Sequence, residues 1–389
     1  VIFYIKVQTN YNWPWKGLQS LERRQVMKIK TAVASTKGQP LVVTEAVLDE
    51  PKANEVLVEI KATGVCHTDA AGRDLAVTPY PVALGHEGAG IVKKIGSAVT
   101  TVKPGDHVVL SFAHCGKCVN CLSGHPANCI HLNELCFGGS NYDGSYRIHD
   151  LEGKDISTFF GQSSFSDYSV ADEHNVVKVD KTVDINLLGP LGCGFQTGAG
   201  AVLNYLKPKF GSSIVIFGTG AVGLAALMAA KIENLNHIIA VDIHDNRLSI
   251  AKELGASEVI NSKKEDVEAA IEKIIPGGAD YTIDTTGVAA VIKNAVHVLK
   301  AAGKCIFLGM TGDVTFNIQE EVMGEAKQLI GIVEGDSVPQ LFIPQLIDYY
   351  KKGLFPFDKL VKFYNFKDIN QAFTDSATGE VIKPIVKIS

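Results

Sequence analysis

Residues 213–232 read SIVIFGTGAVGLAALMAAKI, and they carry the clearest structural signal in the chain. An apolar, β-branched run leads directly into Gly218, Gly220 and Gly223, and a run of Ala, Leu and Met, which favour helix, follows. Between a buried strand and a helix, the spacing G-x-G-x-x-G allows a tight turn whose backbone can approach a pyrophosphate at the helix N-terminus. This stretch therefore predicts a dinucleotide-binding turn.

The next strand, HIIAVD at 237–242, ends on Asp242, which lies 19 residues after Gly223. A carboxylate there can accept hydrogen bonds from the adenosine ribose and would repel a 2′-phosphate, so we expect NAD and not NADP. Arg247 lies five residues further on, where it could meet a phosphate or cover the adenine. Glycines used only as turn formers, with Asp242 as a strand cap, are the alternative, which the flanking strand and helix and the distance to Asp242 disfavour.

Strand and helix patterns continue to alternate after this turn, in NRLSIAKELGA at 246–256, EVINS at 258–262 and ADYTIDTTG at 279–287. Alternation of this kind predicts parallel βαβ units. Before about Val179, short β-branched runs separated by Gly, Pro and Asp predict mostly antiparallel sheet. The expected fold class is α/β, with a doubly wound parallel-sheet (Rossmann) nucleotide domain and a mostly β catalytic domain that has a zinc-bound loop.

These patterns divide the chain into four segments. We expect an extension of unknown role at 1–26, a β-rich catalytic domain at 27–194 with a zinc lobe at 114–130, an NAD-binding domain at 195–337, and a return to the catalytic domain at 338–389. The last segment ends in KPIVKIS, a strand that could join the first domain again. The extension precedes Met27, where the first clear strand pattern begins, and is left out of the fold prediction.

The composition excludes several classes of protein. The chain has 389 residues, of which 46% are hydrophobic, and this is enough to build two domain cores. A formal net charge of −5 provides no basic surface for nucleic acid. No apolar run reaches the ~20 residues that a membrane-spanning helix needs. Since no secretory signal is recognised, we expect a cytoplasmic protein whose thiols stay reduced.

Four of the eight cysteines lie in the stretch CGKCVNCLSGHPANC at 115–129. Four thiolates at this spacing can surround one cation tetrahedrally and leave no position for a substrate, which predicts a structural zinc. The ligands expected are Cys115, Cys118, Cys121 and Cys129. A thiol-disulfide role is the alternative for C-x-x-C, but two overlapping pairs and a fourth cysteine favour metal. The flanking His114, His125 and His131 are expected at the surface, and Cys136 and Cys305 are expected as buried or loop thiols without a metal.

Three further motifs are weak alone but informative together: GVCHTDA at 64–70, GHEGAG at 85–90 and GPLGCGFQTG at 189–198. With the glycine turn and the cysteine cluster, they resemble the zinc-dependent medium-chain alcohol dehydrogenase family. GQSSFSDYSV at 161–170 and DKLVKFY at 358–364 are similar to its bacterial aryl-alcohol (benzyl alcohol) branch. The resemblance runs from about Met27 to the last residue.

The resemblance implies a catalytic zinc held by Cys66, His86 and Cys193, with a fourth position open for water or an alcohol. Asp69 and Glu87 would lie behind these ligands and orient them. Two thiolates neutralise the dication, and the remaining Lewis acidity lowers the pKa of a bound alcohol toward neutrality. Together with the cysteine cluster, two zinc ions per subunit are expected.

The resemblance also implies a path for the hydroxyl proton. Thr68 matches the family's Ser or Thr whose hydroxyl lies beside the zinc-bound oxygen and begins a relay through the nicotinamide ribose. In well-known members the relay ends in a histidine, which would fall at position 71, where this chain has Ala71. We therefore expect either a water chain or direct release of the proton to bulk solvent.

Several residues are expected to bind the cofactor because of the same resemblance. Thr197 and Val222 would line the nicotinamide, and Lys383 falls where the family often has an arginine near the pyrophosphate. His67 also stands where many relatives have an arginine near the pyrophosphate. Because an imidazole with an unperturbed pKa of ~6.5 binds an anion weakly and in a pH-dependent way, we expect NADH to leave faster than with arginine.

The expected function is NAD-dependent oxidation of a primary alcohol, aromatic or allylic, to its aldehyde, in a homo-oligomer for which a tetramer is favoured over a dimer. Phe159, Phe160 and Phe165 suit a flat apolar ligand, but they are equally suitable core residues. Alternatives are a dehydrogenase of short aliphatic alcohols, a zinc-free NADPH-dependent quinone or enoyl reductase of the same fold, and a zinc-module binding or scaffold protein. The complete ligand set and the dinucleotide motif disfavour the last two.

Overall fold

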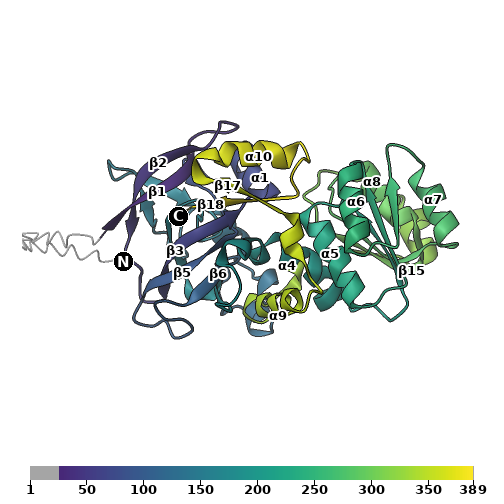
Figure 1. The fold of residues 1–389 in the computed structure, drawn as a ribbon, viewed down its shortest axis with the longest axis horizontal. Coiled ribbons are helices and arrows are strands. Elements are labelled where there is room, and N and C mark those ends of the chain that lie inside the picture. Colours follow the sequence, from purple (N-terminus) through teal and green to yellow (C-terminus); the bar gives the residue numbers. More distant parts are fainter. Residues whose placement is uncertain (1–25, 389) are drawn as a thin grey trace, which may run out of the picture.

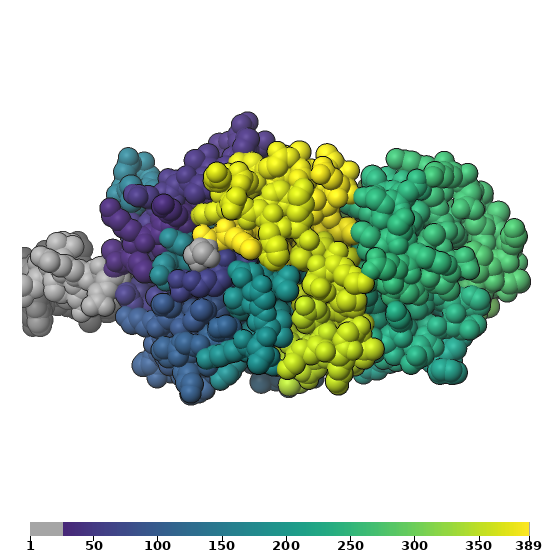
Figure 2. Space-filling view, viewed as in Figure 1, coloured from purple at the N-terminus to yellow at the C-terminus, as the bar shows by residue number. Residues whose placement is uncertain are grey.

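The computed structural model describes residues 26–388. The extension expected at 1–26 lies outside this range except for Val26, which begins the first strand. Figure 1 shows a β-rich part that holds the chain's N-terminal half, an α/β part beyond it, and α4 and α9 between the two. Figure 2 shows the C-terminal segment, in yellow, lying against both parts. Over residues 26–388, no helix combines the length and the apolar character needed to span a membrane.

The β-rich part contains two sheets. The first is a closed barrel of β1 (Val26–Ala34), β2 (Val42–Asp49), β7 (Ile148–His149), β8 (Asp155–Thr158) and β4 (Val82–Ala83). The second has the order β10 (Val176–Lys178), β6 (His107–Leu110), β5 (Gly88–Ile95), β3 (Glu55–Gly64), β18 (Lys383–Lys387) and β17 (Val361–Asn365), with β9 (Tyr168–Asp172) paired to β3. The C-terminal strand β18 runs antiparallel to β3, with Ile385 opposite Gly64.

The α/β part is built on a parallel sheet of six strands. Its order is β13 (Glu258–Asn261), β12 (His237–Asp242), β11 (Ser213–Phe217), β14 (Ala279–Asp284), β15 (Leu299–Phe307) and β16 (Gln328–Gly331). All residues of β11 are buried, as expected for the central strand of a parallel sheet that is covered on both faces. The predicted α/β fold class, with a Rossmann sheet and a β-rich domain, is confirmed.

Helices connect and cover these sheets. They are α1 (His67–Asp74), α2 (Val119–Leu122), α3 (Leu132–Phe137), α4 (Gly194–Gly200), α5 (Ala221–Ile232), α6 (Asp245–Leu254), α7 (Val267–Ile274), α8 (Ala289–His297), α9 (Pro339–Lys351) and α10 (Ile369–Ala377). The helical path of α4 continues through the π-helix Ala201–Leu206, called η5.

A continuous apolar core joins the two parts of the molecule. Val109 of β6, Ile216 of β11, Leu224 of α5 and Phe342 of α9 belong to one buried cluster. Packed side chains therefore join the two parts, and the segment that connects them is not an open linker. The residues at this crossing, in α4 and at the start of α5, pack closely against each other, and the candidate site is built on them.

Candidate active site

Three segments far apart in the sequence bring their metal-binding side chains together. Cys66 immediately precedes α1, His86 lies in the loop between β4 and β5, and Cys193 immediately precedes α4. One ligand atom from each of these residues and one from Glu87 all lie within 4.8 Å of one another. Two thiols and an imidazole are the donor set that suits zinc, so the residues fit the expected metal.

Asp69 holds two of these segments in place. Its Oδ1 lies 2.8 Å from His86 Nδ1 and accepts a hydrogen bond from the Gly85 amide, while its Oδ2 accepts one from the Cys66 amide. With Nδ1 directed at Asp69, the other ring nitrogen of His86 is the metal-binding one. Within residues 26–388 this buried Nε2 has no hydrogen-bond partner, which is expected of a nitrogen that binds a cation.

The two thiols interact directly with each other. Their hydrogen bond lowers the pKa of Cys66 well below its usual value and raises the pKa of Cys193 well above it. A bound dication would favour the thiolate form of both residues, which is a further reason that the cluster suits zinc.

Glu87 and Lys383 form a buried ion pair beside the cluster. Lys383 Nζ lies 2.9 Å from both oxygens of Glu87, and it also donates to the carbonyl of Val65. Burial lowers the pKa of Lys383, but the charge and hydrogen bond of Glu87, together with the charges of Cys66 and Cys193, raise it above its usual value. Burial raises the pKa of Glu87 against the lowering effect of Lys383. The structure thus places Lys383 against Glu87, and its contact with a pyrophosphate stays a prediction.

Aromatic rings enclose the imidazole of His86. Phe160 stacks on it with the ring centroids 4.5 Å apart, and Phe159 meets it edge-on at 5.6 Å. Phe165 is fully buried and packs on Phe373 at 5.9 Å, so it contributes to the core. Two of the three phenylalanines expected at the pocket therefore lie beside a metal ligand.

The start of α1 places the residues expected to handle the proton. Thr68 is half-buried, and its Oγ1 lies 3.8 Å from Cys66 Sγ. His67 is exposed at the first position of the helix, and Ala71 is buried one turn further along. The hydroxyl is thus at the cluster, and the neighbouring imidazole faces solvent.

Glu334 is a site residue that the sequence analysis missed. Its Oε1 lies 3.7 Å from Cys193 Sγ, and its Oε2 accepts from Gln196 Nε2 at 3.2 Å and from Thr197 Oγ1 at 3.5 Å. Burial raises the pKa of Glu334 to about 7. In the sequence this residue stands in VEGDS, which has the appearance of an ordinary loop, and no spacing links it to Cys193.

The short segment Glu334–Asp336, called η8, has an unusual backbone. Its three residues have φ values of 47°, 67° and 47°, which lie in the left-handed region that side chains other than glycine rarely adopt. Gly335 is needed there, because a Cβ would lie 2.3 Å from the carbonyl oxygen of Gln196. While Glu334 points to the cluster, Asp336 accepts hydrogen bonds from His125 Nδ1 and Asn128 Nδ2 of the zinc lobe.

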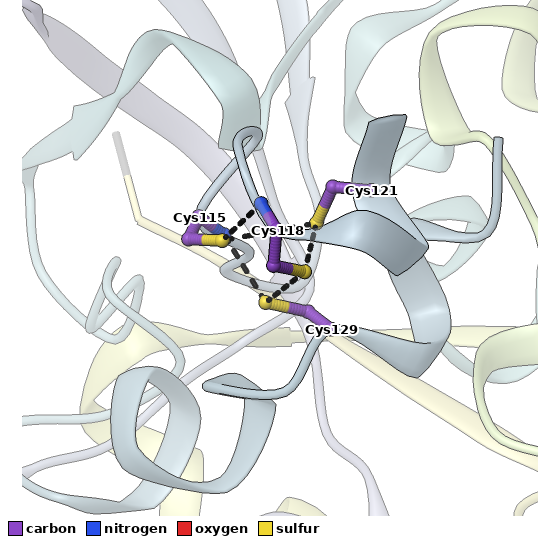
Figure 3. A group of neighbouring side chains, drawn as sticks. All are labelled: Cys115, Cys118, Cys121 and Cys129. Atoms are coloured by element: carbon purple, nitrogen blue, oxygen red, sulfur yellow. Dashed lines mark hydrogen bonds between the residues drawn. The ribbon is translucent and has the colours of Figure 1, made fainter. Parts of the chain in front are cut away.

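The cysteine cluster of the zinc lobe is also assembled. Figure 3 shows the four sulfurs of Cys115, Cys118, Cys121 and Cys129 converging on one point. The Cys118 sulfur lies 3.5 Å from that of Cys121 and 4.0 Å from that of Cys129. Backbone amides of Cys118 and His131 donate to Cys115 and Cys129 sulfurs, as they do toward thiolates in metal sites. All four thiols are free, which fits a tetrahedral zinc and not a disulfide.

The prediction for the histidines beside this cluster is wrong in one case. His125 is exposed and His131 is half-buried, but His114 is buried, because its ring packs on Phe112 at 5.5 Å. Burial lowers the pKa of His114 to about 4, so the ring is neutral near pH 7. Cys136 and Cys305 are buried, as predicted.

The glycine turn has the shape that a pyrophosphate site needs. Gly218 has a φ of 89°, and a Cβ there would lie 2.5 Å from Thr285 Oγ1. A Cβ on Gly223 would lie 1.8 Å from the Gly218 carbonyl oxygen, so α5 packs tightly on the turn. A Cβ on Gly220 would meet no atom within 4 Å, so this side of the turn is open to a ligand. The residues fit a dinucleotide.

The nucleotide turn and the metal cluster meet at α4. A Cβ on Gly194, the residue after Cys193, would lie 3.9 Å from Val222 Cγ2, and one on Gly198 would lie 1.9 Å from the Val222 carbonyl oxygen. Thr197 is on the same helix. Arg247 lies on α6, close to Gly379 in the C-terminal segment. Its Nε has no hydrogen-bond partner among the described residues.

Comparison with known proteins places the chain in a family. The alcohol dehydrogenase GroES-like domain matches residues 52–181, and the zinc-binding dehydrogenase domain matches residues 221–350. Geraniol dehydrogenase of Castellaniella defragrans is 41% identical over 370 residues, which cover 94% of this chain and 99% of that protein. S-(hydroxymethyl)glutathione dehydrogenase of Saccharomyces cerevisiae is 35% identical over 378 residues, which cover 93% and 96%.

Solved structures give the same result. Benzyl alcohol dehydrogenase from Acinetobacter calcoaceticus superimposes with a TM-score of 0.90 at 45% identity, over 93% of this chain and 100% of that one. An alcohol dehydrogenase zinc-binding domain protein from Burkholderia ambifaria has a TM-score of 0.91 at 46% identity, over 94% and 100%. The chain therefore belongs to the zinc-dependent medium-chain alcohol dehydrogenase family, whose members oxidise alcohols with zinc and a nicotinamide cofactor.

Proposed function

We propose that the protein is an NAD-dependent zinc alcohol dehydrogenase that converts a primary aromatic or allylic alcohol to its aldehyde. The observation that carries this proposal is the convergence of Cys66, His86 and Cys193 next to the helix that meets the glycine turn. Support for the substrate class comes from the similarity to a geraniol and to a benzyl alcohol dehydrogenase, and from the rings of Phe159 and Phe160 at His86.

Each part of the site has a task in this reaction. Zinc, when bound, would supply the Lewis acidity that makes the hydroxyl proton of the alcohol removable near neutral pH, and NAD would supply the hydride acceptor. Thr68 can accept that proton at Oγ1 and pass it outward. Asp69 keeps His86 in the tautomer that leaves Nε2 free. The phenylalanine rings exclude water from one side of the ligand set.

Proton release is the step where this chain departs from well-known relatives. Ala71 has no group that can take a proton, so the path beyond Thr68 and the ribose ends in water or bulk solvent. The exposed imidazole of His67 lies next to Thr68 in the sequence, and its expected contact with the pyrophosphate is weaker than that of an arginine. His67→Arg should therefore slow NADH dissociation in stopped-flow fluorescence, and an unchanged rate would contradict this role.

NAD is favoured over NADP because of Asp242. Its carboxylate lies at the end of β12, directly beside the glycine turn, to which Thr219 binds it. A 2′-phosphate would bring a second negative charge close to this carboxylate. We propose two zinc ions per subunit, one for each group of metal-binding residues. The tetrameric state rests on the resemblance alone, and mass photometry tests it.

A steady-state panel tests this function. Purified enzyme is assayed with benzyl, cinnamyl, geranyl and ethyl alcohol, each with NAD and with NADP. We expect kcat/KM with NAD to be higher for the three unsaturated alcohols than for ethanol. A similar value for ethanol would remove the aromatic or allylic assignment and leave the dehydrogenase assignment intact.

Metal analysis of Cys193→Ser separates the two metal sites. We expect this variant to lose activity and one of the two zinc ions, while the zinc lobe keeps the other. Wild-type enzyme with a single zinc, bound only by Cys115, Cys118, Cys121 and Cys129, would contradict the proposed mechanism.

A further inference from the structure

The carboxylate of Asp242 is fully hydrogen-bonded by the protein itself. Its Oδ2 accepts from the amide nitrogen and from the hydroxyl of Thr219, each at 2.7 Å. Its Oδ1 accepts from the amides of Ile243 at 2.7 Å and His244 at 3.0 Å. Asp242 is 7% exposed and Thr219 is fully buried. A carboxylate offers about four acceptor positions, so these four donors occupy them all.

A ribose hydroxyl that binds Asp242 must therefore share or replace one of these donors. Three of them are backbone amides, one in the glycine turn and two directly after β12. Backbone hydrogen bonds hold both segments, from the Gly218 amide to the Val241 carbonyl and from the Ser262 amide to the Asp242 carbonyl. The hydroxyl of Thr219 is different, because rotation about one side-chain bond releases it without moving the backbone.

We propose that the Thr219 hydroxyl is an internal substitute for a ribose hydroxyl. It satisfies the Asp242 carboxylate when no cofactor is bound, and it competes with the ribose for Oδ2 when NAD or NADH binds. Thr219 therefore weakens cofactor binding and speeds cofactor release. This inference rests on the proposed function, since it requires that the ribose of NAD binds Asp242.

This competition predicts a characteristic pattern in the affinities for NAD, NADH and NADP. NAD and NADH have the same adenosine ribose, so loss of the Thr219 hydroxyl must change both affinities by the same factor. NADP carries a phosphate on the 2′-oxygen, and repulsion between this phosphate and Asp242 keeps its ribose from taking the place of the competitor, so its affinity should not rise. An effect at the nicotinamide end would instead distinguish NAD from NADH.

The experiment compares Thr219→Val, which has the same shape without the hydroxyl, with Thr219→Ser, which keeps the hydroxyl. Thr219→Ala is a second variant without the hydroxyl, in case valine disturbs the turn. Thr282→Val is the matched control, because Thr282 is also fully buried and its hydroxyl binds the Ala295 carbonyl, away from the turn. The Kd values of NADH, NAD and NADP are measured with the zinc-loaded protein by fluorescence titration and competition.

We expect Thr219→Val to lower the Kd of NAD and of NADH about threefold to tenfold, which corresponds to one hydrogen bond. The Kd of NADP should not fall, and Thr219→Ser and Thr282→Val should bind like the wild type. The cofactor-free Thr219→Val protein should melt at a lower temperature than the wild type, and the difference should shrink when NADH is saturating. This stability readout does not depend on catalysis.

Two results would overturn the inference. One is weaker binding of NAD by both Thr219→Val and Thr219→Ala, which would mean that the hydroxyl positions Asp242 for the ribose. The other is an unchanged Kd of NAD. A wild-type protein that binds NADP more tightly than NAD would instead contradict the proposed cofactor, so the two failures are distinguishable.

Discussion

Asp69 is the residue on which the geometry of the metal ligands most depends, because it bonds to the segments of Cys66 and His86 at the same time. Asp69→Asn keeps the shape of the side chain but replaces one of the two carboxylate oxygens, which accept hydrogen bonds, by an amide nitrogen. Loss of such a partner behind a ligand usually costs about 10-fold to 100-fold in metal affinity. We expect zinc to leave the variant faster when a colorimetric chelator is added, and one zinc per subunit to be affected.

Asp74→Asn is the control for this comparison, because Asp74 ends the same helix and pairs with Arg73. Its zinc release should match that of the wild type. If Asp69→Asn released zinc no faster than Asp74→Asn, Asp69 would not be the residue that orients His86.

At the scale of elements, η8 connects the two groups of metal-binding residues. Asp336→Ala removes the acceptor for His125 and Asn128, and Glu334 two residues earlier loses part of the support for its strained backbone. We expect kcat/KM to fall several-fold, because even a small displacement of groups at the active site slows the reaction. Both zinc ions should be retained. Metal analysis with steady-state kinetics measures this.

Asp313→Ala is the control, because it changes an exposed aspartate in the loop that follows β15. It should alter neither kcat/KM nor the zinc content. Loss of the lobe zinc in Asp336→Ala would show that Asp336 supports the lobe instead of the active site, and unchanged kinetics would contradict a role for η8.

A second element-scale prediction concerns His297, the last residue of α8. It hydrogen-bonds to Glu321 and to Glu268 of α7, and the bond to Glu321 is the main cause that raises its pKa. A group whose pKa is raised by folding stabilises the fold below its unfolded pKa, and this contribution is lost as pH rises through the folded pKa. The melting temperature of His297→Gln should therefore lie further below that of the wild type at pH 6 than at pH 9. An equal difference at both pH values would contradict this.

For the whole molecule, the contact of α4 with α5 decides how the nucleotide turn meets the metal cluster. Gly198→Ala would place a Cβ 1.9 Å from the Val222 carbonyl oxygen, so the two helices must separate. Overpacking of this kind costs about 1–3 kcal/mol, and we expect a lower melting temperature together with a higher Kd for NADH. Gly312→Ala is the control, because no atom lies within 4 Å of its Cβ position. A variant that melts and binds like this control would contradict the prediction.

Patterns within single segments were enough to predict the Rossmann turn and the cysteine lobe. G-x-G-x-x-G acts through backbone shape, and four cysteines within fifteen residues converge because the chain between them is short. The separate motifs of Cys66, His86 and Cys193 could be joined only through the resemblance to a family. The structure brings them together, as it does the ligands of the lobe.

The remaining features came only from the tertiary structure. Glu334 lies at Cys193 and Lys383 binds Glu87, although no sequence pattern links the members of either pair. The glycine motif links its turn to Asp242, but it does not show that the Thr219 hydroxyl occupies this carboxylate. The buried state of His114 was missed for the same reason. Hydrogen bonding and burial depend on which segments the fold places side by side, and a linear pattern carries that information only when the partners lie close in the sequence or belong to one recurring motif.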